Sequence, residues 1–135
     1  MSNVSHPSHY TGGILPGECI DYVKYLDFCR GNVIKYLWRS EEKNGQEDVR
    51  KSSQYLDFII QSPCVITGSI PREVLDALNE ECTKVLSDYS QRGAQKYDFI
   101  YCIYTLANLD TSAGTNDVTL MTQVLQKIIN NHIED

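Results

Sequence analysis

The pattern of apolar and polar residues over residues 28–42 predicts an amphipathic helix. Apolar side chains fall on one side of a helical wheel: Val33, Ile34, Leu37 and Trp38. Hydrogen-bonding side chains fall on the opposite side: Asn32, Lys35, Tyr36 and Arg39. This segment is therefore expected to bury one face and to present amide, basic and hydroxyl groups on the other.

A further helix is expected from Gln46 to about Gln61, with one polar stripe formed by Asp48, Lys51, Ser52 and Tyr55. Asn44 and Gly45, between the two segments, form a strong turn pattern that lets the helices run antiparallel. Lysine, arginine, asparagine and tyrosine side chains would then converge on one cleft. Such groups are suited to holding a phosphorylated small molecule.

The remaining segments also favour helices. These are expected near residues 18–26, from about Pro71 to Arg92-Gly93, from Ala94 to Leu109, and from Asp117 to His132. Either Ser69 or Ile70 is expected as the N-cap of the helix that starts near Pro71. Ser62-Pro63 stops the preceding helix, and residues 63–69 are either a linker or an edge strand. The predicted fold class is all-α, a compact helical domain of about six helices with an ordered N-terminal arm over residues 1–16.

Length and composition set the protein class. The chain has 135 residues, of which 41% are hydrophobic, so it forms one domain or one domain with a helical extension. We expect a domain over residues 1–61 and a helical extension for packing or oligomerisation over residues 62–135. No apolar run reaches the ~20 residues of a membrane span, and the first residues lack signal-peptide features. The sequence therefore predicts a soluble cytoplasmic protein without a membrane partner.

The net charge indicates which partners to expect, and the cysteine pattern indicates the oxidation state of the thiols. A net charge of −6 argues against a duplex nucleic-acid binder, which needs a basic face. Residues 1–61 hold 7 basic and 8 acidic residues, whereas residues 62–135 hold 5 and 10, so a cationic site is expected in the first half. The five cysteines are odd in number and widely spaced, which indicates reduced thiols.

Several short motifs occur in a specific order between residues 4 and 61. They are HPSHY (residues 6–10), ECID (18–21), Phe28, Gly31-Asn32, IKYLWR (34–39), Lys43, Glu47-Asp48, Lys51 and Tyr55-Leu56. In order and spacing they resemble a small domain family of unknown function that is common in tailed bacteriophages and prophages. At least one phage member is described as a nucleotide kinase acting on deoxynucleoside monophosphates. This chain departs from the family pattern at residues 40–42 and 52–53.

The resemblance and the wheel together imply one ligand site. Its expected residues are His6, Ser8, His9, Tyr10, Asn32, Lys35, Tyr36, Arg39, Lys43, Lys51 and Tyr55. The N-terminal arm is expected to act as a lid or wall of this site. No residue is assigned a catalytic role, and no metal site is assigned.

Most of these features have a structural alternative. Lys35 and Arg39 would also suit a solvated helix face paired with Glu42 or Asp48. Glu18 and Asp21 would either hold Mg²⁺ or cap a helix. The Tyr97, Tyr101 and Tyr104 stripe fits packing or base stacking, and Trp38 fits a core or an interface.

Three function classes follow from the sequence. The first is a nucleotide kinase-like phosphotransferase acting on (deoxy)nucleoside monophosphates, for which Mg²⁺ would be the cofactor. The second is a protein that sequesters a nucleotide second messenger and so blocks host antiviral defence. The third is a helical interaction protein. The chain lacks a P-loop motif. The apolar residues after Pro71 further predict a homo-oligomer.

Overall fold

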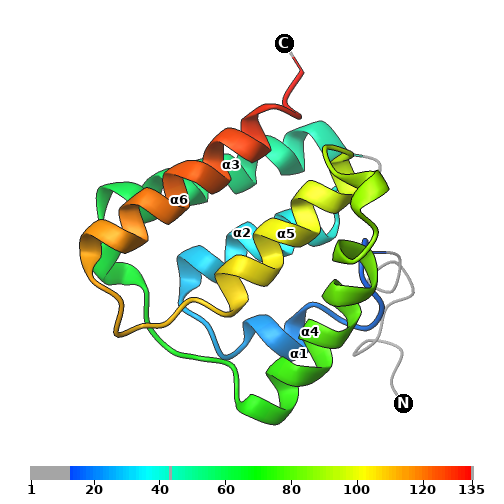
Figure 1. The fold of residues 1–135 in the computed structure, drawn as a ribbon. Helices are drawn as coiled ribbons and strands as arrows, with labels where there is room; N and C mark the ends of the chain where they lie inside the picture. Colours follow the sequence, from blue (N-terminus) through cyan, green and yellow to red (C-terminus); the bar gives the residue numbers. More distant parts are fainter. Residues whose placement is uncertain (1–12, 43, 135) are drawn as a thin grey trace, which may run out of the picture.

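The described structure, a computed structural model, is helical throughout. It covers residues 13–42 and 44–134, and this part of the chain contains six α-helices, two short 3₁₀ turns and no β-strand (Figure 1). The elements are α1 (Ile20–Val23), α2 (Phe28–Trp38), α3 (Gly45–Gln61), η2 (Pro63–Val65), α4 (Arg72–Leu86), η3 (Tyr89–Gln91), α5 (Gln95–Ala107) and α6 (Thr115–Asn130). The predicted all-α class is confirmed. None of the described helices combines the length and the apolar character of a membrane span.

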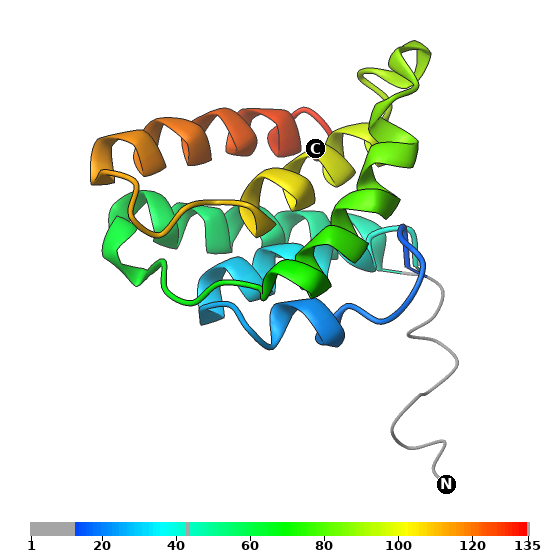
Figure 2. The ribbon, with the colours of Figure 1, turned by 60° about the horizontal axis from the view of Figure 1, so that its bottom comes forward.

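The six helices form two layers of three. Helices α1, α2 and α3 make the first layer, and α4, α5 and α6 lie over it as the second layer (Figure 2). Each helix of one layer contacts a counterpart in the other, so that α1 lies beside α4, α2 beside α5, and α3 beside α6. The helices of residues 62–135 therefore pack directly on those of residues 1–61.

The core lies between the layers and is centred on α2 and α5. The wheel prediction for α2 is confirmed, because the four apolar residues named above are at most 2% exposed. The α5 side chains that face them are also buried: Phe99, Ile100, Cys102, Ile103 and Leu106. Each fully buried aliphatic or phenyl side chain stabilises the fold by about 1.5–3 kcal/mol relative to an exposed one. Burial of its inner face thus fixes which side of α2 points outward.

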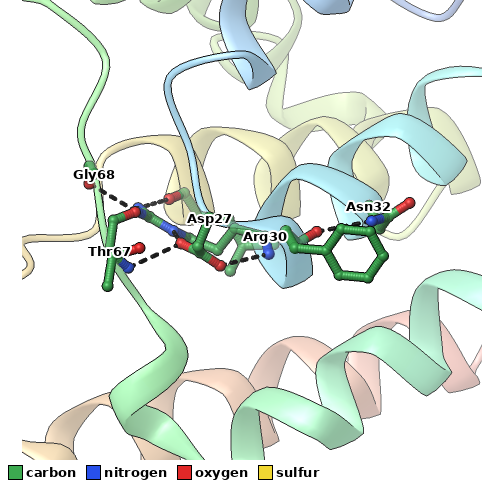
Figure 3. A network of polar contacts seen from close by, with 7 residues as sticks. Asp27, Arg30, Asn32, Thr67 and Gly68 are labelled. Carbon is green, nitrogen blue, oxygen red and sulfur yellow. Dashed lines mark hydrogen bonds and ion pairs between the residues drawn. The ribbon is translucent and has the colours of Figure 1, made fainter.

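A buried arginine joins three separate segments of the chain (Figure 3). Arg30 is 0% exposed, and its Nε donates to Asp27 Oδ1 at 2.6 Å. Its terminal nitrogens donate to the carbonyls of Thr67 and Gly68, at 2.8 and 2.9 Å, and of Leu106, at 3.1 Å. Asp27 also caps α2 by accepting from the Arg30 amide and accepts from the Thr67 amide. This network, the Arg30 hub, attaches the start of α2 to the 67–68 loop and to the end of α5.

The segment predicted as a linker or edge strand is a connecting loop. It begins with η2 and then forms one isolated bridge between Gly68 and Leu26. Gly68 has a φ of +77°, and a Cβ atom there would lie 2.4 Å from the Tyr25 carbonyl oxygen. Only glycine fits this position without a shift of the backbone, so the loop reaches Arg30 through a residue without a side chain.

Three predicted helix ends are wrong by several residues. Helix α1 ends at Val23 because the chain then turns to bring Leu26 to Gly68. Helix α2 ends at Trp38, after which Ser40 Oγ donates to the Leu37 carbonyl. Helix α4 ends at Leu86, and the Asp88 carboxylate accepts from the Ser90 amide in the turn that follows. Local side-chain bonds to the backbone compete with further helical turns at the latter two sites.

The predicted N-cap of α4 is also wrong. Ser69 and Ile70 were the expected alternatives, whereas the structure places the cap at Pro71, with Arg72 as the first helical residue. Proline has a fixed φ and no N–H to lose, so it is favourable at a helix start. The proline pattern therefore located this end of the helix to within two residues.

Polar contacts close the fold between α3 and the C-terminal end of α6. The Gln46 side chain donates to the His132 carbonyl and accepts from the Glu134 amide, at 2.9 and 2.8 Å. Ser53 contributes two further bonds, to the side chains of Asn130 and Gln126. The first turn of α3 is thereby bound to the residues that follow α6, and the third turn of α3 is bound to α6 itself.

The Arg30 hub yields a stability prediction. Arg30→Ala leaves the Asp27 carboxylate buried without its cation, so unfolding free energy should fall by about 3–5 kcal/mol. Arg72→Ala removes an arginine whose side chain is 82% exposed and should change stability by less than about 0.5 kcal/mol. Urea unfolding followed by circular dichroism measures both, and equal midpoints for the two variants would contradict the assigned role.

Candidate functional site

The expected polar residues that the structure describes lie on the outer face of the first layer. Helices α2 and α3 run antiparallel, since Arg39 contacts Asp48 near their connection while Phe28 contacts Tyr55 at the other end. This arrangement confirms the predicted helical hairpin. It places side chains of both helices on one continuous surface, on the side of α2 opposite to the core.

The centre of this surface is a tyrosine pair. The rings of Tyr36 and Tyr55 are stacked, with centroids 5.9 Å apart and planes inclined by 18°. Three cationic groups surround Tyr36: Lys35 Nζ lies 4.3 Å from its centroid, Lys51 Nζ 5.5 Å and Arg39 Cζ 5.9 Å. Cations in these positions interact favourably with the electron-rich face of a phenol ring. The two tyrosine rings thus contact each other across the helix pair, at the place where the polar side chains of α2 and α3 were predicted to converge.

Two of the three cations also pair with carboxylates. Arg39 Nε donates to Asp48 Oδ2 at 3.1 Å, and the Asp48 side chain is only 3% exposed. Lys51 lies 3.0 Å from Glu47, whose carboxylate raises the pKa of Lys51 mainly through their hydrogen bond. The Arg39–Asp48 pair is one of the two pairings expected if this face is solvated, and it is present in the structure. Lys35 has no ion-pair partner within the part of the chain that the structure describes.

The other expected residues are placed as follows. The Asn32 amide donates to the Phe28 carbonyl at 2.8 Å, so it binds its own helix. His6, Ser8, His9, Tyr10 and Lys43 lie outside the described residues. The described chain begins at Gly13 against the indole of Trp38, and the Ile14 amide donates to the Trp38 carbonyl at 2.9 Å. Residues 13–14 are thus attached to the end of α2, one residue before Arg39.

Two phenylalanines extend this surface, although sequence reasoning did not assign them to the site. Phe28 is 72% exposed and Phe58 is 54% exposed. Both contact Tyr55 in edge-to-face geometry, with centroid distances of 5.6 and 5.7 Å. The same helical wheels place Phe28 on the Lys35 and Arg39 side of α2, and Phe58 beside Lys51 on α3. Attention to apolar residues outside the apolar stripe would have found both.

The carboxylate and thiol groups of the described residues do not gather into a reactive cluster. Within residues 13–42 and 44–134, no group of three or more histidine, cysteine, aspartate or glutamate side chains could hold a metal ion. All five cysteines are free thiols. Burial raises the pKa of Cys19 and of Cys82 to about 12, and it raises the pKa of Cys102 further. These three thiols are protonated at neutral pH and are weak nucleophiles.

The structure therefore defines an all-α protein whose outer face combines aromatic and cationic side chains. Residues 4–57 match the family model of a protein of unknown function (DUF3310), and this region includes all of the expected ligand residues. The match overlaps the segment in which the motifs were recognised. No curated protein and no solved structure matches the chain.

The thiol environments predict the order of alkylation. In folded protein at mildly alkaline pH, Cys64 is exposed and should react first with iodoacetamide, followed by Cys29, whose pKa is raised by partial burial and by Asp27. Cys19, Cys82 and Cys102 should be labelled only after addition of denaturant, because their raised pKa values leave little thiolate. Peptide mass spectrometry gives the order, and early labelling of Cys82 would show that this site is open.

Proposed function

We propose that the outer face of α2 and α3 binds a nucleotide or a nucleotide-derived small molecule. The observation that carries the proposal is the grouping of Lys35, Arg39 and Lys51 around the stacked Tyr36–Tyr55 pair. The three cations outnumber the two carboxylates that pair with them, Glu47 and Asp48, in a chain of net charge −6. A local excess of positive charge beside aromatic rings suits a ligand that has phosphate and base.

The resemblance to a phage and prophage family favours the same ligand class. It suggests a kinase-like transfer of phosphate to a (deoxy)nucleoside monophosphate in the cytoplasm of the host cell, with Mg²⁺ as cofactor. The alternative is sequestration of a nucleotide second messenger by the same residues without turnover. Incubation with a nucleotide panel followed by chromatography separates the two, because sequestration returns the bound ligand unchanged and a kinase converts it.

Lys35 is the site residue whose substitution is expected to affect the stability of the fold least. Arg39→Ala would leave the buried Asp48 carboxylate unpaired, so a loss of binding in that variant would be mixed with a loss of stability. Lys35 has no ion pair with the other described residues, and alanine is a good helix former. Removal of its side chain should therefore affect the ligand without affecting the fold.

Lys35→Ala should weaken nucleotide binding by about 1.5–3 kcal/mol, the contribution of a hydrogen bond to a charged group. This corresponds to a roughly 10- to 100-fold increase in Kd by isothermal titration calorimetry. Lys84→Ala, on the second layer, is a matched control because Lys84 is exposed and, among the described residues, its ion pair is with Glu81. Equal affinities for the wild type and a folded Lys35→Ala variant would refute the proposed site.

We also propose that the second layer mediates homo-oligomer formation. The structure buries many of the apolar residues that suggested it, including Leu78, Phe99, Ile103, Leu106, Leu125 and Ile129. It leaves five hydrophobic side chains of α5 and α6 exposed: Tyr101, Tyr104, Leu120, Met121 and Val124. An apolar face of this kind is commonly covered by a symmetric copy. The ligand surface lies on the other layer and would stay accessible in such an assembly.

Light scattering should give the wild type a mass of at least twice the 15.4 kDa of one chain. Leu120→Asp should shift the protein toward the monomer, since it places a charge in the apolar face. Gln54→Asp, which places the same charge at an exposed position of α3, should leave the mass unchanged. A monomeric wild type at micromolar concentration would contradict the oligomer.

A further inference from the structure

The cation–aromatic surface has two chemically different ends. At one end, all three cations lie within 6 Å of the Tyr36 centroid. At the other end, Tyr55 is flanked by Phe28 and Phe58, and no cation lies over any of these three rings among the described residues. The surface therefore changes from cationic to purely aromatic along the α2–α3 pair.

The two phenylalanine side chains at the aromatic end are largely exposed to solvent. Phe28 and Phe58 are 72% and 54% exposed, although most aliphatic residues of α2 and α3 are almost completely buried. Neither phenylalanine is needed to fill the core, because Leu56 and Ile59 of α3 and Val33 and Ile34 of α2 already do so. Both rings contact Tyr55 edge to face, so the three rings form one aromatic cluster.

We propose that Phe28 and Phe58 form a base-stacking platform and determine that the ligand is a nucleotide rather than any other phosphate ester. The inference rests on the proposed function and adds the orientation of the ligand to it. The phosphate lies at the Tyr36 end, beside Lys35 and Lys51, and the base lies on the exposed rings at the other end. The polarity of the surface matches that of a nucleotide, which is anionic at one end and aromatic at the other.

Stacking also predicts the kind of selectivity. Every nucleobase has a π-face, so an aromatic platform binds purines and pyrimidines without reading their hydrogen-bonding edges. The side-chain amide of Asn32, on the same helix as Phe28, is already bonded to the Phe28 carbonyl. The platform is therefore expected to discriminate weakly between bases and strongly against ligands that have no base.

The test compares ligands that do and do not have a base, using the full chain. The probes are dTMP, dGMP, ribose 5-phosphate and inorganic pyrophosphate, measured by calorimetry at low salt. Phe28→Leu and Phe58→Leu keep apolar volume but lose the aromatic face, whereas Phe58→Tyr keeps that face. Each leucine variant should weaken dTMP and dGMP binding about 10- to 100-fold and leave pyrophosphate binding unchanged. Phe58→Tyr should retain most of the affinity.

The remaining variants separate this inference from the proposed function. Lys35→Ala should weaken nucleotides and pyrophosphate alike, and Tyr89→Leu, which alters an exposed ring in η3, should weaken neither. If the leucine variants bind both nucleotides normally while Lys35→Ala does not, the platform is wrong and the phosphate site stands. Equal losses for pyrophosphate and nucleotides in the leucine variants would also overturn the platform. A wild type that binds none of the nucleotides would overturn the proposed function together with the platform.

Discussion

The rest of the structure depends on the buried ion pair between Arg30 and Asp27. A guanidinium that is removed from water needs its charge balanced and its N–H groups bonded, and the arrangement of the chain around Arg30 satisfies both. That arrangement brings together the start of α2, the 67–68 loop and the carbonyl of Leu106, which is 76 residues away from Arg30. Because Asp27 also caps α2, the ion pair sets where this helix begins and how it is rotated.

The rotation of α2 has a direct effect on the candidate site. Once its inner face is committed to α5 and the core, Lys35, Tyr36 and Phe28 lie on the outside together with Lys51, Tyr55 and Phe58 of α3. The two faces of the first layer thus have separate roles, one in stability and one in surface chemistry. Substitutions on the outer face remove little buried apolar area, with Arg39 as the exception because its partner Asp48 is buried.

Sequence reasoning succeeded where the information is local. Wheel patterns separated the buried from the outward residues of α2, and the Asn44-Gly45 pattern gave the antiparallel pairing with α3. It did not anticipate the role of Arg30, because a buried arginine looks like any surface cation until a carbonyl 76 residues away is known. It missed Phe28 and Phe58 for the opposite reason, since a large apolar side chain is assumed to be buried. The predicted end of α4 was wrong because the Asp88 carboxylate accepts a hydrogen bond from the Ser90 amide, which competes with a further helical turn.

The pairing of α3 with α6 has a consequence for how the chain is synthesised. Gln46 binds backbone groups of His132 and Glu134, and the helix that covers α3, α6, is synthesised after all the other described helices. Until then α1, α2 and α3 have no counterparts, and the apolar side of their layer is open to water. Folding of this helical unit is therefore expected to finish only after α6 has been synthesised, and until then the open apolar side exposes the chain to aggregation.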